Sequence, residues 1–104
     1  MRTKEQLEKY RKELRVLEEQ EATLTSLQRK GQELAETTYS ELVPIVNKFA
    51  ETNEPLVFAR QQFGKLEAEF LEEISHMKRK VSNQKEALEH SYRQLKQQTE
   101  KNNQ

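Results

Sequence analysis

The segment Thr52-Asn53-Glu54-Pro55 lies almost at the midpoint of the 104-residue chain and decides its fold. Asparagine tolerates the left-handed conformation that ends many helices. Proline suits the first position of a helix, because the N–H that it lacks would have no partner there. The segment therefore predicts a turn over residues 52–55 between two long helices, at about 3–51 and about 55–96. Residues 97–104 are polar, and we expect them to fray.

The composition favours long helices over a compact β fold. Charged residues make up 35% of the chain and hydrophobic residues 33%, whereas ordinary domains are nearer half apolar. All 18 acidic residues are glutamate, which tolerates helix interiors, while aspartate favours caps and turns. The apolar residues are spaced too regularly for a disordered chain. We expect a single all-α domain that spans residues 1–104.

Apolar residues before the turn follow a heptad repeat, in which positions a and d face a second helix. The a positions are 7, 14, 21, 28, 35, 42 and 49, and the d positions are 10, 17, 24, 31, 38 and 45. Pro44 interrupts this pattern, because it lacks an N–H and clashes with the preceding helical turn. We expect a kink or short break near residues 40–44, or a separate short helix that begins at Pro44. Continuity of the first helix through Pro44 stays open at this point.

The second helix carries a matching repeat. Its a positions include Ile74, Val81, Leu88 and Leu95, and its d positions are Leu56, Phe63, Phe70, Met77, Gln84 and Ser91. Folding the chain about the turn places small residues opposite large ones, which fills the space between facing layers. The expected pairs include Ala35 with Phe70, Gly31 with Ile74, Tyr10 with Leu95, and a polar layer of Glu21 with Gln84. The pattern predicts a long antiparallel two-helix hairpin that resembles a coiled coil.

Apolar residues also continue outside the a and d positions. An apolar stripe wider than one seam indicates a further helical partner. We therefore predict that the hairpin assembles into a larger helical bundle. A complex with a different helical protein is favoured, and a homo-oligomer is the alternative. The predicted partner-binding residues are Leu27, Leu34, Tyr39, Val46, Val57, Phe58, Leu66 and Leu71.

No residue pattern points to catalysis, a cofactor or a metal. Glu73 and His76 have the spacing found in di-iron bundles, but they fall at heptad positions near the solvent side. Cysteine is absent, and two histidines are too few for most zinc sites. The sequence contains neither a glycine-rich phosphate loop nor a Ser-His-acid grouping. We expect a protein that is not an enzyme and that binds no cofactor.

The charge balance argues against a nucleic-acid partner. Net charge is zero, whereas nucleic-acid binders usually carry a basic excess. The basic triplet Lys78-Arg79-Lys80 is interpreted as solvated helix surface. No apolar run reaches transmembrane length, so stable membrane insertion is not expected. Residues 1–5 lack the apolar stretch of a secretory signal, so we expect a cytoplasmic protein, or export by a route that needs no signal peptide.

A cysteine-free chain of this length, folded about a central turn, resembles the WXG-type (ESAT-like) proteins of type VII secretion. It looks more like the small helical partners encoded beside LXG toxins in Gram-positive bacteria. The resemblance is one of architecture: the chain has no Trp, and Lys96 follows Tyr92 where the export signal of the family has an acidic residue.

This resemblance implies a chaperone and targeting factor that binds the helical N-terminal domain of an LXG toxin and aids its targeting to the secretion machinery, and whether the chain is exported with the toxin stays open at this point. The alternative is a self-associating coiled-coil scaffold protein. A third reading, a helical protein that depends on nucleic acid or metal, rests on Lys78-Arg79-Lys80 or on His76.

Overall fold

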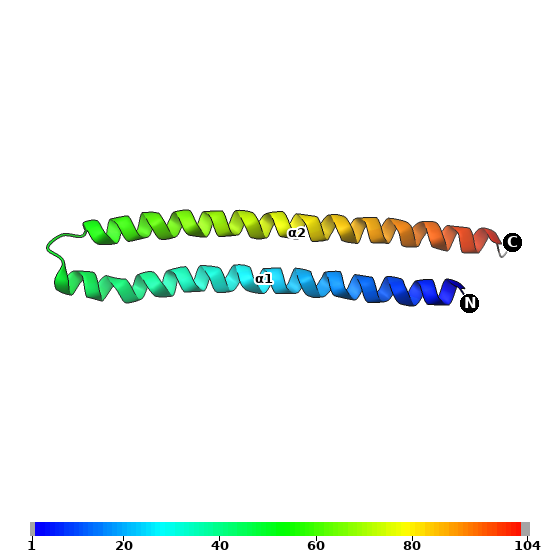
Figure 1. Cartoon of the computed structure of the whole chain (residues 1–104), viewed down its shortest axis with the longest axis horizontal. Coiled ribbons are helices and arrows are strands. Elements are labelled where there is room, and N and C mark those ends of the chain that lie inside the picture. The colour runs from blue at the N-terminus through cyan, green and yellow to red at the C-terminus, as the bar shows by residue number, and fades with distance from the viewer. Residues whose placement is uncertain (1, 103–104) are drawn as a thin grey trace. The chain divides into compact units, whose positions relative to one another are not determined.

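The computed structural model describes residues 2–102 and the side chains of residues 4–101. These residues form two α-helices, α1 (Arg2–Phe49) and α2 (Glu54–Asn102). The helices run antiparallel and are joined by residues 50–53 (Figure 1). The predicted all-α fold, an antiparallel two-helix hairpin, is confirmed, and the described part of the chain contains no strand.

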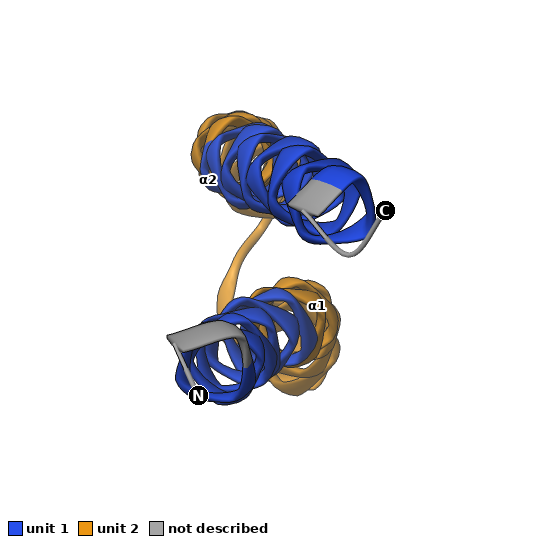
Figure 2. Cartoon of the chain, turned by 90° about the vertical axis from the view of Figure 1, so that its right-hand side faces the viewer, with its two compact units in different colours: residues 1–23, 77–104 blue, residues 24–76 orange. Residues whose placement is uncertain are grey.

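The hairpin divides into two compact units, and each unit contains a segment of both helices (Figure 2). Unit 1 comprises residues 1–23 and 77–104, so it pairs the first part of α1 with the last part of α2. Unit 2 comprises residues 24–76, which include the rest of α1, the turn and the start of α2.

The turn lies two residues earlier than the sequence predicted, at 50–53 instead of 52–55. The Ala50 amide still donates to the Val46 carbonyl at 2.8 Å. The Asn53 carbonyl accepts the first hydrogen bonds of α2, from the amides of Leu56 and Val57 at 3.0 and 3.1 Å. Pro55 occupies the first turn of α2, where its missing N–H costs nothing. Asn53 caps the helix without a left-handed conformation, since no described residue has a positive φ.

α2 is longer than the sequence predicted, and α1 is less interrupted. Pro44 lies inside α1, which continues on both sides of it, so the expected break is absent. The tail expected to fray from residue 97 continues α2 as far as Asn102. Residues 103 and 104 of that predicted tail lie outside the described residues.

The seam, by which we mean the row of least exposed residues on each helix, contains the core. Among residues 4–101 its buried apolar side chains are Leu24, Val46, Ile74 and Val81, and no polar side chain is buried. The seam follows the predicted heptad positions 7, 10, 14, 17, 24, 28, 31, 35 and 42 in α1, and 56, 63, 74, 81, 88 and 95 in α2.

The heptad prediction is wrong elsewhere. Residues 21, 38, 45 and 49 are exposed in α1, and residues 70, 77, 84 and 91 are exposed in α2. In α1 the seam passes from 35 to 39, 42, 46 and 50, and in α2 from 67 to 71, 74, 78, 81, 85, 88 and 92. A helix makes a turn in about 3.6 residues, so it drifts from a strict heptad, and successive steps of four at 31, 35 and 39 in α1 and at 59, 63, 67 and 71 in α2 absorb the difference. After residue 71 the seam of α2 keeps a heptad spacing, but from a different starting position than predicted.

Candidate protein-interaction surface

Large apolar side chains that remain exposed gather in unit 2. Among the described side chains, Val16 and Met77 are the members of this group that lie in unit 1. In unit 2, Leu34 is 68% exposed and Leu66 is 59% exposed, although both are large aliphatic residues. The other members in unit 2 are Leu27, Ile45, Phe49, Val57, Phe58 and Phe70.

Leu34 of α1 and Leu66 of α2 line the same groove of about 320 Å³ in unit 2. The small residues Gly31, Ala35 and Thr38 line it on the α1 side. On the α2 side it is lined by Phe63, Glu67 and Phe70. The groove shows that exposed leucines from two helices border one side of unit 2.

The spacing of the other exposed residues extends this side of the unit. Leu27 and Ile45 are eighteen residues apart, about five full helical turns, and Leu34 lies seven residues after Leu27. These three residues therefore share one stripe of α1. Leu66 and Phe70, four residues apart, share a stripe of α2. We call the five residues Leu27, Leu34, Ile45, Leu66 and Phe70 the outer face.

Five of the eight predicted partner-binding residues are exposed, and the other three lie in the seam. Leu27, Leu34 and Leu66 belong to the outer face. Val57 is also exposed, but it lies nine residues before Leu66, which is about two and a half turns and places it on the opposite side of α2. Phe58, which is 63% exposed, lies at the start of α2 beside the turn.

The other three predicted residues lie in the seam of unit 2. Val46 is only 9% exposed and belongs to the core, so its expected place on a free surface is wrong. Tyr39 and Leu71 are half-buried, and the guanidinium of Arg60 lies 5.4 Å from the centre of the Tyr39 ring. The cause is the step from residue 35 to residue 39, which turns Val46 into the seam.

Two residues that the sequence analysis placed in the seam lie on the outer face: Ile45, because of this step in α1, and Phe70, because the seam of α2 passes in steps of four through 59, 63, 67 and 71. The sequence contained a signal for the wider spacing of the seam residues in α1. Gln28, Tyr39 and Ala50 are separated by eleven residues each, and an eleven-residue repeat follows a straight helix more closely than a heptad does.

Unit 1 contains a larger groove but a more polar surface. The groove measures about 570 Å³, and it is lined by the apolar residues Val16, Leu17, Ala87 and Leu88 together with five polar or charged ones. Two contacts between the helices hold this unit together: the rings of Tyr10 and Tyr92 stack with centroids 4.2 Å apart, and the Lys85 ammonium lies 3.3 Å from a Glu21 carboxylate oxygen. Leu95, the predicted partner of Tyr10, lines the same groove as Tyr10 and Tyr92, whereas Glu21 contacts Lys85 beside the predicted Gln84.

The residues with possible catalytic or metal-binding chemistry do not converge. Glu73 and His76 are both exposed, and no group of three or more potential metal ligands exists among the described residues. Lys78 is half-buried on the seam side of α2, whereas Arg79 and Lys80 are exposed, so the basic triplet does not form one continuous patch. Within the described residues, neither helix has the length of apolar sequence needed to cross a membrane.

The comparisons with known proteins add no relative. No protein-family model matches the chain, and no curated protein or solved structure matches it significantly. The exposed apolar surface of unit 2 is therefore the feature of the structure that points to a function.

Proposed function

We propose that the chain is a non-enzymatic helical interaction module whose outer face is covered by helices of another protein chain. The observation that carries this proposal is the exposure of Leu34 and Leu66 along one apolar groove. Isolated apolar residues are common on protein surfaces, but a contiguous apolar patch marks a binding site. Of the predicted binding residues the proposal keeps Leu27, Leu34 and Leu66, and it adds Ile45 and Phe70.

The surface area of the chain supports the same proposal. The chain exposes 8870 Å² at a mass of 12.4 kDa, whereas compact monomeric proteins of that mass expose about 6,100 Å². The surplus of about 2,700 Å² per chain is of the order that large permanent interfaces bury. Covering the outer face removes apolar groups from water, at about 1.5–3 kcal/mol for each fully buried leucine or phenylalanine.

The groove suits a helix as its occupant. Small side chains on one wall allow another backbone to approach, and larger side chains beside them form ridges that fit between the ridges of a partner helix. An amphipathic helix with apolar residues three and four positions apart binds in this way. The partner chemistry proposed is therefore an amphipathic helix or a pair of such helices.

The resemblance described above suggests which protein supplies these helices. We propose the helical N-terminal domain of an LXG-type toxin, for which this chain acts as a chaperone and targeting factor of type VII secretion. The two proteins then meet in the cytoplasm and leave the cell together. The architecture supports this choice of partner, and no sequence motif adds to it.

The test is co-purification with an LXG-type N-terminal domain encoded beside this chain. Leu34→Glu and Leu66→Glu place a charge on the outer face and are expected to weaken the complex by tenfold or more, since about 1.4 kcal/mol corresponds to each factor of ten. Val57→Glu is the matched control, because Val57 is an exposed apolar residue on the opposite side of α2. Circular dichroism should show equal helicity in all three variants. Equal binding by all three would contradict the proposal.

A self-associating scaffold protein is the second candidate. It is favoured by the charges that border the outer face, Lys30 on α1 and Glu69 and Glu73 on α2.

A further inference from the structure

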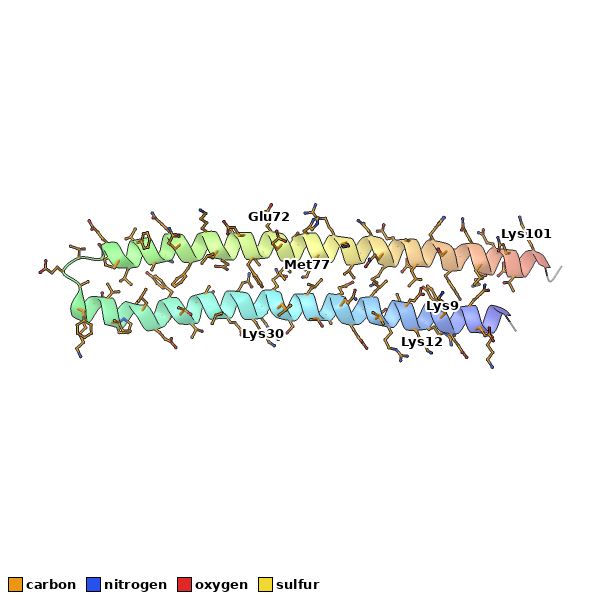
Figure 3. All side chains as sticks on the ribbon, viewed as in Figure 1. Lys9, Lys12, Lys30, Glu72, Met77 and Lys101 are labelled. Carbon is orange, nitrogen blue, oxygen red and sulfur yellow. The ribbon has the colours of Figure 1, made fainter. Side chains whose placement is uncertain are left out.

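Charged residues border the outer face on both helices. Lys30 lies three residues after Leu27 and four before Leu34, at the edge of the α1 stripe. Figure 3 shows Lys30 projecting from α1 on the side turned away from α2. Glu69 and Glu73 follow Leu66 and Phe70 by three residues each, at the corresponding edge of the α2 stripe. At this level of unit 2 the outer face is therefore bordered by Lys30 on α1 and by Glu69 and Glu73 on α2, whereas nearer the turn the same edge of α1 carries Glu41, eleven residues after Lys30.

The two edges lie at the same height along unit 2. The ring of Phe70 lies against Gly31, which brings these two residues level with each other. Lys30 is adjacent to Gly31, and Glu69 is adjacent to Phe70, with Glu73 one turn further along α2. All three charged side chains are exposed, and none of them forms an ion pair within the described part of the chain.

We propose that, in the absence of another partner, a second copy of this chain covers the outer face with both turns at the same end. The second copy is rotated by half a turn about an axis parallel to the helices, so that α1 of each copy lies against α2 of the other. This rotation keeps every residue at its height. Lys30 of each copy then meets Glu69 and Glu73 of the other, and Leu34 of each copy lies across Leu66 of the other.

The charges select this arrangement over the other symmetric one. Turning the second copy end over end would place α1 against α1 and α2 against α2, so the acidic edges would meet each other. Charges at the flanks of helical interfaces choose both partner and orientation.

This inference rests on the proposed function of the outer face as an interaction surface. It adds that the face is complementary to itself, so that a helical partner has to displace the second copy. Until a partner displaces it, the second copy covers the apolar groove and protects it from nonspecific association.

The experiment is light scattering coupled to size-exclusion chromatography on the full chain, over a dilution series. The unmodified chain is expected to be a dimer. Lys30→Glu alone, and Glu69→Lys with Glu73→Lys, should each weaken self-association about tenfold, since each change turns two attractive contacts into repulsive ones worth up to about 1 kcal/mol each. An equimolar mixture of the two variants should form a heterodimer as stable as the original dimer, because opposite charges meet again at both edges.

Glu72→Lys is the matched control, since Glu72 projects from α2 away from α1 (Figure 3). It should leave the dimer unchanged. A monomer at about 100 μM would overturn the inference, as would a dimer whose two charge variants fail to recover on mixing. If the chain is a monomer but its toxin complex is lost in Leu34→Glu, the proposed function stands without the dimer. If dimer and toxin complex both survive Leu34→Glu and Leu66→Glu, both proposals are wrong.

Discussion

The ring of Phe70 lies directly against Gly31 on the opposite helix. A Cβ atom added at Gly31 would lie 2.9 Å from Cδ1 of this ring and closer still to Cε1. The absence of a side chain at position 31 therefore gives the ring its place, and the ring in turn lines the groove between Leu34 and Leu66. This contact aligns the two helices of unit 2, and one side of the ring stays on the outer face.

Gly31→Ala and Gly64→Ala should have different effects on stability, although both replace a glycine inside a helix. Alanine is favoured over glycine in a helix by about 1 kcal/mol. Gly64 has open space around it, so Gly64→Ala should stabilise the chain by about 0.5–1 kcal/mol. Gly31→Ala forces the Phe70 ring to move, and the displaced packing costs about 1–3 kcal/mol, which cancels or exceeds the gain. Urea denaturation followed by circular dichroism measures both changes.

Phe70→Leu provides the control for this comparison. In a Phe70→Leu background the clash at position 31 is smaller, so Gly31→Ala should be less harmful there than in the unmodified chain. Equal stabilisation by the two glycine substitutions in the unmodified chain would show that the Phe70 ring is not held against Gly31.

The fold was predictable because two signals agreed. The turn at Thr52-Asn53-Glu54-Pro55 and the rows of apolar residues on both sides of it pointed to the same hairpin. Which residues of the two helices face each other was predictable only in part, because the prediction extended a strict heptad spacing through the whole of each helix. Gly31 itself lies in the seam as predicted, but the ring against it is that of Phe70 and not the predicted Ile74, and by Ile45 the seam of α1 has moved to the neighbouring residue Val46.

The residues assigned to the outer face depend on where the seam departs from the heptad spacing. Val46 and Ile45 are adjacent in the sequence and similar in character, so composition does not tell which one is buried. A straight helix turns Val46 into the seam and leaves Ile45, at 55% exposure, on the outer face. The apolar surplus was visible from the sequence, but its concentration on one side of unit 2 required the structure.

Val46→Asp and Ile45→Asp test this assignment. Both should be introduced together with Leu34→Glu and Leu66→Glu, so that association through the outer face does not affect stability. Val46→Asp puts a charge into the core and should cost about 3 kcal/mol or more in the free energy of unfolding, because a buried charge has no partner there. Ile45→Asp affects an exposed position and should cost less than about 1 kcal/mol. The reverse order, measured by urea denaturation, would restore the heptad assignment.

Pro44→Ala should stabilise the chain. α1 continues through Pro44, although a proline lacks the amide donor and crowds the turn before it. Replacement by alanine at this exposed position should raise the free energy of unfolding by about 1–3 kcal/mol. Pro55→Ala is the control, and it should change stability little, because Pro55 occupies the first turn of α2, where no donor is needed. A loss of stability in Pro44→Ala would mean that the helix uses the proline, for example to set its curvature.

The contact between Lys85 and Glu21 gives a test of the register in unit 1. The heptad prediction placed Gln84 opposite Glu21, whereas the structure places the half-buried Lys85 there, at 3.3 Å. Lys85→Glu brings two carboxylates together and should lower the free energy of unfolding by about 1 kcal/mol.

Adding Glu21→Lys to Lys85→Glu reverses the pair and should recover most of that loss. Gln84→Glu is the control for the predicted register, and it should be close to neutral because Gln84 is exposed. The measurement is a double-mutant cycle by urea denaturation at low salt, repeated at about 1 M salt, where the coupling between the two residues should shrink. A coupling energy near zero between positions 21 and 85, together with a clear loss in Gln84→Glu, would show that α2 is turned by one residue from its place in the structure.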